Sequence, residues 1–171
     1  MTTQRAIVWD TSVLDVYLQV PGKATCGPET DKWDHARIAR LVEERQMDGT
    51  LFVMPIAAIL ECGNHIAQIK GDRYPLAQKL SELIRSAAEG TTPWAAIDQF
   101  EQVWSGESLK QLAADWPKRA AEGLSLSDLT ISRVAEHYAQ WGMQVEILTG
   151  DGGLKALEPR GPQREIPRRR S

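Results

Sequence analysis

Three short, mostly apolar runs are spaced along the chain, and the stretches between them have helical periodicity. The runs cover residues 5–9, 51–54 and 145–149. Strands that are apolar throughout are typical of a parallel sheet buried on both faces, and parallel strands need helical crossovers to join them. The pattern therefore predicts an α/β fold, with a central parallel sheet between two layers of helices.

The segments between these runs predict most of the helices. Apolar periodicity and helix-ending residues place them at 13–20, 31–46, 55–71, 75–88, 127–141 and, as a short last helix, 154–157. Residues 21–30 are predicted to form a loop. The segment 91–123 is harder to interpret. It predicts a short strand or a helix start at 93–97 and a helix at 108–116 that Pro117 interrupts.

The chain length and charge pattern indicate one domain with a basic tail. With 171 residues, the chain fits a single domain, which we place at 1–159, and a tail at 160–171. The tail carries +4, which leaves −7 on the domain from a net charge of −3. An acidic body with a short basic tail is not the pattern of a non-specific DNA-binding protein, whose basic residues cover a face.

The composition excludes several classes of protein. The two cysteines form no C-x-x-C motif, which excludes a zinc ribbon or a disulfide framework and favours a reducing compartment. The sequence lacks a secretory hydrophobic region, and its longest apolar run is too short to cross a bilayer. We therefore expect a soluble cytoplasmic protein with no membrane partner. Phosphate-binding motifs of the Walker and G-x-G-x-x-G types are also missing.

Four carboxylates are expected to converge at one edge of the sheet. Asp10 follows the first strand and Asp151 follows the last, which places both at the carboxyl edge where parallel sheets bind ligands. Glu61 lies in an apolar stretch of the helix after the second strand, and Asp128 opens a late helix. Local explanations stay open, since Asp10 fits a helix cap, Asp128 a capping box and Asp151 a turn.

Such a cluster of carboxylates predicts a cation. Like charges in a partly desolvated cleft repel one another, so a cluster persists most readily around a neutralising ion. A donor set of oxygens without a convincing His or Cys favours Mg²⁺ or Mn²⁺ over zinc. The natural reaction is metal-assisted hydrolysis of a phosphodiester.

The four acids also lie in motifs that resemble those of PIN-domain nucleases, in particular VapC-type toxins of bacterial toxin–antitoxin pairs. The matching segments are 7–14 (IVWDTSVL), 54–55 with 59–61 (MP and ILE), 124–131 (LSLSDLTI) and 147–151 (ILTGD). The segment at about 90–123 is longer than in the compact toxins. The resemblance implies a three-layer α/β/α sandwich with a mostly parallel sheet of four to five strands, and a divalent-metal-dependent endoribonuclease.

The resemblance also assigns roles and partners. The catalytic, metal-binding residues would be Asp10, Glu61, Asp128 and Asp151, with Thr11, Ser12 and Thr149 in support. Mg²⁺ or Mn²⁺ would be the cofactor. The implied partners are an RNA substrate, an antitoxin protein and a second copy of the chain in a homodimer.

Weaker candidates and alternative functions complete the expectations. Arg133 and Lys155 are candidates for contacting a substrate phosphate, with a solvated surface charge as the alternative. His65 shares a helix face with Glu61 and is a candidate for assisting proton transfer, although a histidine on a polar helix face is common. The alternative functions are a non-catalytic PIN-like binding or regulatory module, and a PIN nuclease that acts on DNA or in RNA maturation.

Overall fold

A parallel sheet forms the centre of the molecule. The computed structural model describes residues 4–95 and 103–161. Within them the sheet has the order β4–β1–β5, with β1 (Arg5–Trp9) between β4 (Leu51–Val53) and β5 (Gln144–Leu148). The mixed α/β class predicted from the sequence is confirmed.

The order of the strands places a crevice at the end of β1. Ile7 of β1 pairs with Phe52 of β4, and Val8 pairs with Ile147 of β5, both in parallel. The chain visits β4 on one side of β1 and then crosses to β5 on the other side. Such a reversal of direction opens a crevice beyond the carboxyl ends of the strands.

The described sheet is smaller than the resemblance implied. Trp94 adds one isolated parallel bridge to Phe52 on the outer side of β4. Within the described residues the parallel sheet therefore has three strands plus this bridge, and not the expected four to five. Part of the short element expected at 93–97 lies outside the described residues.

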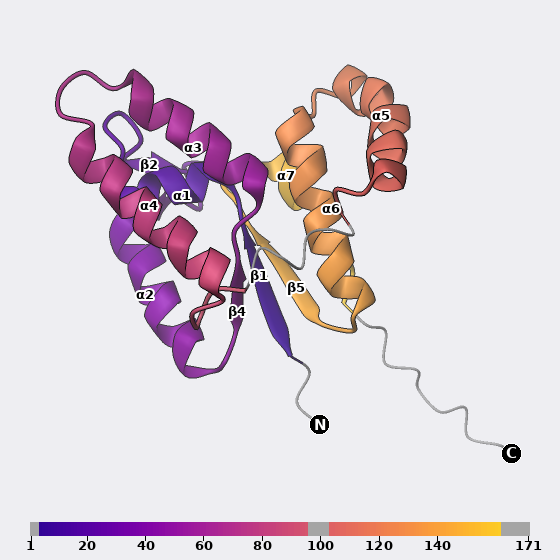
Figure 1. Ribbon diagram of the computed structural model, residues 1–171, viewed down its shortest axis with the longest axis horizontal. Helices are drawn as coiled ribbons and strands as arrows, with labels where there is room; N and C mark the ends of the chain where they lie inside the picture. The colour runs from indigo at the N-terminus through magenta and orange to yellow at the C-terminus, as the bar shows by residue number, and fades with distance from the viewer. Residues whose placement is uncertain (1–3, 96–102, 162–171) are drawn as a thin grey trace, which may run out of the picture.

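Helices cover both faces of the sheet (Figure 1). On one face lie α1 (Thr11–Leu18), α2 (His35–Met47), α3 (Ile56–Gln68) and α4 (Tyr74–Glu89). On the other lie α6 (Leu126–Gln140) and the short α7 (Gly152–Lys155), and α5 (Gly106–Ala121) packs on the outer side of α6. No helix in the described part of the chain is long and apolar enough to cross a membrane.

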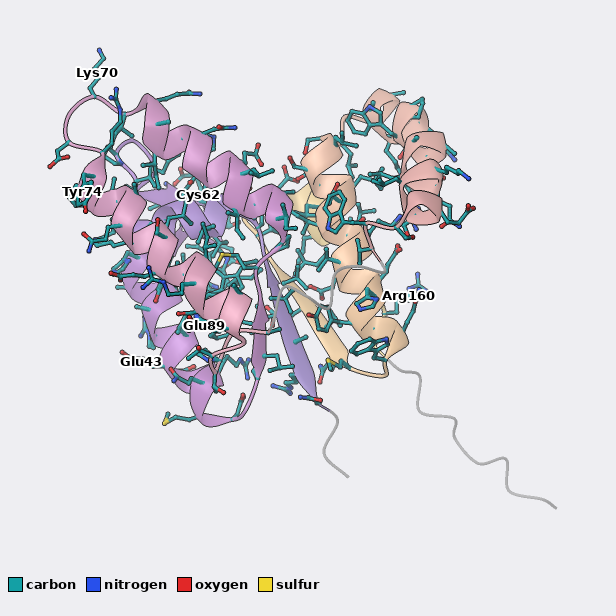
Figure 2. All side chains as sticks on the ribbon, in the orientation of Figure 1. Glu43, Cys62, Lys70, Tyr74, Glu89 and Arg160 are labelled. Carbon is teal, nitrogen blue, oxygen red and sulfur yellow. The ribbon has the colours of Figure 1, made fainter. Side chains whose placement is uncertain are left out.

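Alternation along β1 divides the core into two clusters. Ile7 and Trp9 point into the core shared with α1–α4, whereas Ala6 and Val8 point into the core shared with α6. Cys62 of α3 is fully buried in the first cluster (Figure 2). Both faces of the sheet are therefore desolvated, which explains why the strands are apolar throughout.

A small antiparallel hairpin corrects the prediction for residues 21–46. β2 (Thr25–Cys26) pairs with β3 (Trp33–Asp34), where the sequence predicted a loop and then a helix from residue 31. The helix α2 begins only at His35, because the Asp34 side chain accepts a 2.8 Å hydrogen bond from the backbone N–H of Arg37 and so caps it.

Pro117 does not interrupt a helix, which corrects a second prediction. It lies inside α5, which continues to Ala121. A proline in a helix removes the N–H that would bond to the carbonyl four residues earlier, here that of Ala113. Ala113 is exposed and α5 has no buried residue, so water can satisfy this carbonyl. The basic tail from residue 162 onward lies outside the described residues.

Candidate active site

The four acids selected from the sequence line one pocket. Asp10 follows β1, Glu61 lies in α3, Asp128 lies in the first turn of α6, and Asp151 follows β5. The pocket has a volume of about 380 Å³. It lies at the carboxyl edge of the sheet, where the strand order predicts a crevice.

Asp10 is the most firmly held of the four. Its Oδ1 accepts a 2.6 Å hydrogen bond from the backbone N–H of Thr11. Its Oδ2 accepts hydrogen bonds from the hydroxyls of Ser12 at 2.6 Å and Thr149 at 2.7 Å. The Ser12 hydroxyl in turn accepts from the backbone N–H of Gly150, so this network joins the end of β1 to the end of β5.

Burial makes the negative charge on Asp10 costly. Only 6% of the residue is exposed, and this burial raises the pKa of the carboxyl above its ordinary value. Hydrogen bonds from Ser12, Thr149 and Thr11 oppose the rise in pKa, and the nearby charge of Asp128 adds to it. A cation in the pocket would remove this cost.

Glu61 is held across a helix pair. Its Oε2 accepts a 2.9 Å hydrogen bond from the hydroxyl of Thr11, which connects α3 to α1. This bond brings Glu61 toward the end of β1. Thr11 therefore contacts two carboxylates of the pocket. Its backbone N–H donates to Asp10 and its hydroxyl donates to Glu61.

Asp128 and Asp151 are held by backbone groups close to them in the sequence. Asp128 and Ser125 form a capping box, in which the Ser125 hydroxyl accepts from the Asp128 N–H at 2.9 Å and Asp128 Oδ2 accepts from the Ser125 N–H at 3.1 Å. Asp151 Oδ1 accepts from the N–H groups of Gly153 and Leu154 at the start of α7. Each of these carboxylates uses one oxygen in its local bonds.

The pocket also contains residues that sequence reasoning did not select, namely Asp15, Lys23, Thr25, Cys26 and Ser125. Asp15 carried a signal, because a carboxylate in the apolar helix α1 lies four residues after Thr11 and so shares its face. The hairpin residues had no local signal. The β2–β3 hairpin lies against Gly150 at the edge of the pocket. A Cβ added to Gly150 would lie 2.4 Å from the backbone nitrogen of Gly27 in this hairpin.

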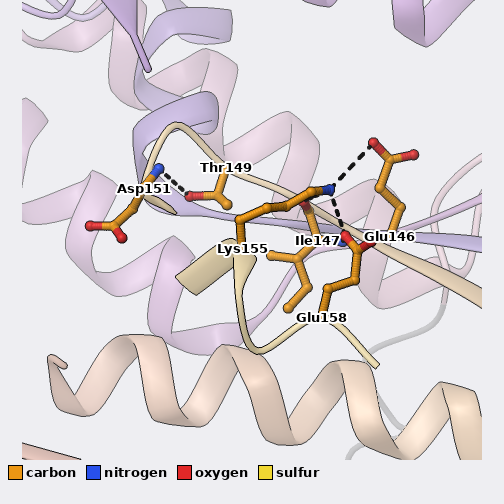
Figure 3. Close-up of polar contacts among 6 residues, drawn as sticks. All are labelled: Glu146, Ile147, Thr149, Asp151, Lys155 and Glu158. Carbon is orange, nitrogen blue, oxygen red and sulfur yellow. Dashed lines mark hydrogen bonds and ion pairs between the residues drawn. The ribbon is translucent and has the colours of Figure 1, made fainter. Parts of the chain in front are cut away.

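Arg133 and Lys155 do not line this pocket. Arg133 of α6 forms ion pairs with Asp115 and Glu136. Lys155 points toward Glu146 and Glu158, away from Asp151 (Figure 3). Both cations are therefore engaged by carboxylates elsewhere on the surface.

The donor chemistry of the pocket suits a hard divalent cation, although the side chains do not form a closed shell. Among the described residues, no three His, Cys, Asp or Glu side chains stand close enough together to hold a metal ion. Mg²⁺ requires no such cage, since it is commonly bound by one or two carboxylates and keeps several waters. The buried carboxylate of Asp10 and the second oxygens of Asp128 and Asp151 supply donors of the required type.

Comparison of the chain with known protein families, with curated proteins and with solved structures finds no match.

Proposed function

We propose that the chain is a PIN-like, divalent-metal-dependent endoribonuclease that hydrolyses RNA phosphodiester bonds. The observation that carries this proposal is that Asp10, Glu61, Asp128 and Asp151 come from distant parts of the chain and line one pocket. The order of the four motifs supports the same conclusion. The three-layer arrangement, with the pocket at the carboxyl edge of a parallel sheet, is compatible with a PIN-like sandwich.

The residues divide into those that would hold the cation and those that hold the carboxylates. One or two of the carboxylates of Asp10, Glu61, Asp128 and Asp151 would bind Mg²⁺ or Mn²⁺ in this pocket, and the ion when bound supplies the Lewis acidity needed at a phosphodiester. Ser12 and Thr149 fix the Asp10 carboxylate through their hydroxyls, and Thr11 fixes Glu61. These hydroxyls restrict the rotation of the carboxylates, so that their oxygens stay in the pocket.

The decisive experiment is cleavage of total RNA by the purified chain with and without Mn²⁺. We expect cleavage that needs the metal and that falls by at least about 100-fold in Asp10→Asn, because loss of a supporting contact alone commonly costs 10–100-fold at a metal site. Parallel reactions on single- and double-stranded DNA separate an RNA-specific nuclease from one that acts on DNA.

A matched variant controls for the loss of a helix-capping charge. Asp34→Asn also changes an aspartate that caps a helix, but Asp34 does not line the pocket. We expect it to cleave RNA at the wild-type rate. If Asp10→Asn and Asp34→Asn cleave equally well in the same metal, the proposed site is wrong.

A non-catalytic PIN-like module is the second candidate, and one observation favours it. The four carboxylates each accept hydrogen bonds from neighbouring groups, and no described group of three forms a ligand cluster. Calorimetry with Mn²⁺ distinguishes the two functions. Saturable binding that Asp10→Asn abolishes supports the nuclease, whereas the absence of saturable heat supports the module.

The biological setting follows from the same proposal. We propose a cytoplasmic toxin that a small antitoxin protein neutralises, and that associates as a homodimer. The two cysteines, Cys26 and Cys62, are both free in the structure. An antitoxin-like reading frame beside the gene would support the toxin role, and its absence would favour RNA maturation.

A further inference from the structure

Two polar contacts cross the interface between α1 and α3. Thr11 and Asp15 lie four residues apart on α1, and Glu61 and His65 lie four residues apart on α3. The first contact joins Thr11 to Glu61. In the second, Nδ1 of His65 lies 2.6 Å from Oδ2 of Asp15.

Burial of the Asp15 carboxylate at this position costs free energy of folding. Its side chain is 2% exposed, and its Oδ1 has no hydrogen-bond partner in the described part of the chain. Burial, followed by a hydrogen bond to Asp15 and by the Asp15 charge, raises the pKa of the Cys62 thiol, so this neighbour stays a neutral S–H group that does not compensate the charge of Asp15. A carboxylate buried with one charged or polar partner commonly stabilises a fold less than an apolar residue of similar size. Helix packing alone therefore does not explain the pair.

His65 lines the acidic pocket together with Asp15. Its side chain is 29% exposed and lines the pocket beside Asp10 and Glu61. A carboxylate only accepts hydrogen bonds, so contact with Asp15 places the imidazole proton on Nδ1. In the neutral ring Nε2 is then the acceptor. The pair has the chemical form of a base with a fixed tautomer, as in other His–Asp arrangements.

The charges around His65 come from each element at the pocket. Asp10 and Asp15 belong to the start and the face of α1, Lys23 precedes the hairpin, and Asp128 and Asp151 start α6 and α7. The helix α4 also packs on α3, but none of its charged residues lines the pocket. His65 is thus the one imidazole among the described pocket residues, which are otherwise carboxylates, hydroxyls, a thiol and a lysine.

We propose that His65 is the general base of the hydrolysis and that Asp15 is its positioning residue. This inference rests on the proposed nuclease function. Nε2 takes a proton from water as the water oxygen bonds to phosphorus. The P–O3′ bond breaks, and its electron pair leaves with O3′, which takes a proton from solvent. His65 then releases its proton to solvent, so that the sum is the addition of one water across the bond.

Kinetics across pH test the role of His65. In RNA cleavage with Mn²⁺, we expect His65→Gln to lower kcat by about 10²–10⁴-fold and to change the dependence of kcat on pH, because the variant lacks the proposed base. Asp15→Asn should lower kcat as well, since an amide favours the wrong tautomer. His35→Gln is the control, because His35 bonds through Nδ1 to the Tyr17 carbonyl, outside the pocket, and should leave kcat and its pH profile unchanged.

Nitrogen NMR of the metal-free protein provides a test that does not depend on activity. We expect neutral His65 to carry its proton on Nδ1, and Asp15→Asn to abolish that preference. An Nε2–H tautomer in the wild type, or an unchanged pH profile in His65→Gln, would overturn the inference. If Asp10→Asn is inactive while His65→Gln cleaves like wild type, only the role of His65 fails. If Asp10→Asn retains full activity, the nuclease proposal fails, and this inference fails with it.

Discussion

The pocket has two walls that are built in different ways. The first wall comes from the end of β1 with α1 and α3, and it comprises Asp10, Thr11, Asp15, Glu61 and His65. Three side-chain contacts on this wall join residues far apart in sequence, Thr11 to Glu61, Asp15 to His65 and Asp10 to Thr149, and Asp10 also accepts two local hydrogen bonds from Thr11 and Ser12. The second wall comprises Ser125, Asp128 and Asp151 at the starts of α6 and α7. Its side chains are held by backbone N–H groups within three residues.

The difference separates contacts that depend on the fold from contacts that depend on a helix end. A side chain on the second wall keeps its orientation whenever its own helix forms, because its partners are local. The contacts Thr11–Glu61, Asp15–His65 and Asp10–Thr149 on the first wall form only when distant elements have packed together. Substitutions on the two walls should therefore have different effects on stability.

The largest expected difference is between two alanine variants. Asp10→Ala removes the acceptor of three hydrogen bonds in a buried position and should cost about 2 kcal/mol of unfolding free energy. Asp151→Ala removes the cap of an exposed helix end and should cost about 0.5–1 kcal/mol. Urea denaturation of both variants measures the difference. Equal losses would show that the two walls do not differ in this respect.

A smaller effect is expected within the second wall. Ser125→Ala removes the hydroxyl that accepts from the backbone of Asp128 and should cost about 1 kcal/mol. Ser127→Ala, two residues along α6, is the matched control and should stay within about 0.5 kcal/mol of wild type. A loss in Ser127→Ala as large as that in Ser125→Ala would contradict the capping role.

The smallest effect concerns the charge on Asp10. Because the pKa of Asp10 is raised in the folded state, the folded protein holds this proton more tightly than the unfolded chain does. The carboxyl therefore lowers stability as the pH rises from 3.8, its ordinary pKa, to the raised value. In metal-free buffer at neutral pH, Asp10→Asn should melt slightly above wild type.

The dependence of this effect on pH provides its check. Below pH 3.8 the wild-type carboxyl is neutral, so the difference in melting temperature should disappear. Thermal melts of both proteins from pH 3 to pH 8 measure it, with Asp34→Asn as the control. A wild type that melts above Asp10→Asn at neutral pH without metal would show that the hydrogen bonds of Asp10 outweigh its burial.

The elements with strong local signals could be predicted from the sequence. The strand before Asp10 and the helix that ends at Gly90 follow from apolar runs and from a glycine in the left-handed conformation. The hairpin at Cys26 and Trp33 was missed, because two-residue strands carry no periodicity and form through tertiary contacts. The pairing of Asp15 with His65 was also missed, because it depends on how α1 and α3 pack against each other.

The position of β1 between β4 and β5 has a consequence during synthesis. In the described sheet, β1 has only one neighbour, β4, until β5 has been made. Asp10 then stays partly unsupported, because Thr149 and Asp151 arrive with the last strand. A growing polypeptide therefore lacks the hydroxyl of Thr149 that orients Asp10, and the carboxylate of Asp151, until β5 and the residues just after it have been made. Under the proposed function, cleavage of RNA would therefore begin only after β5 has joined the sheet.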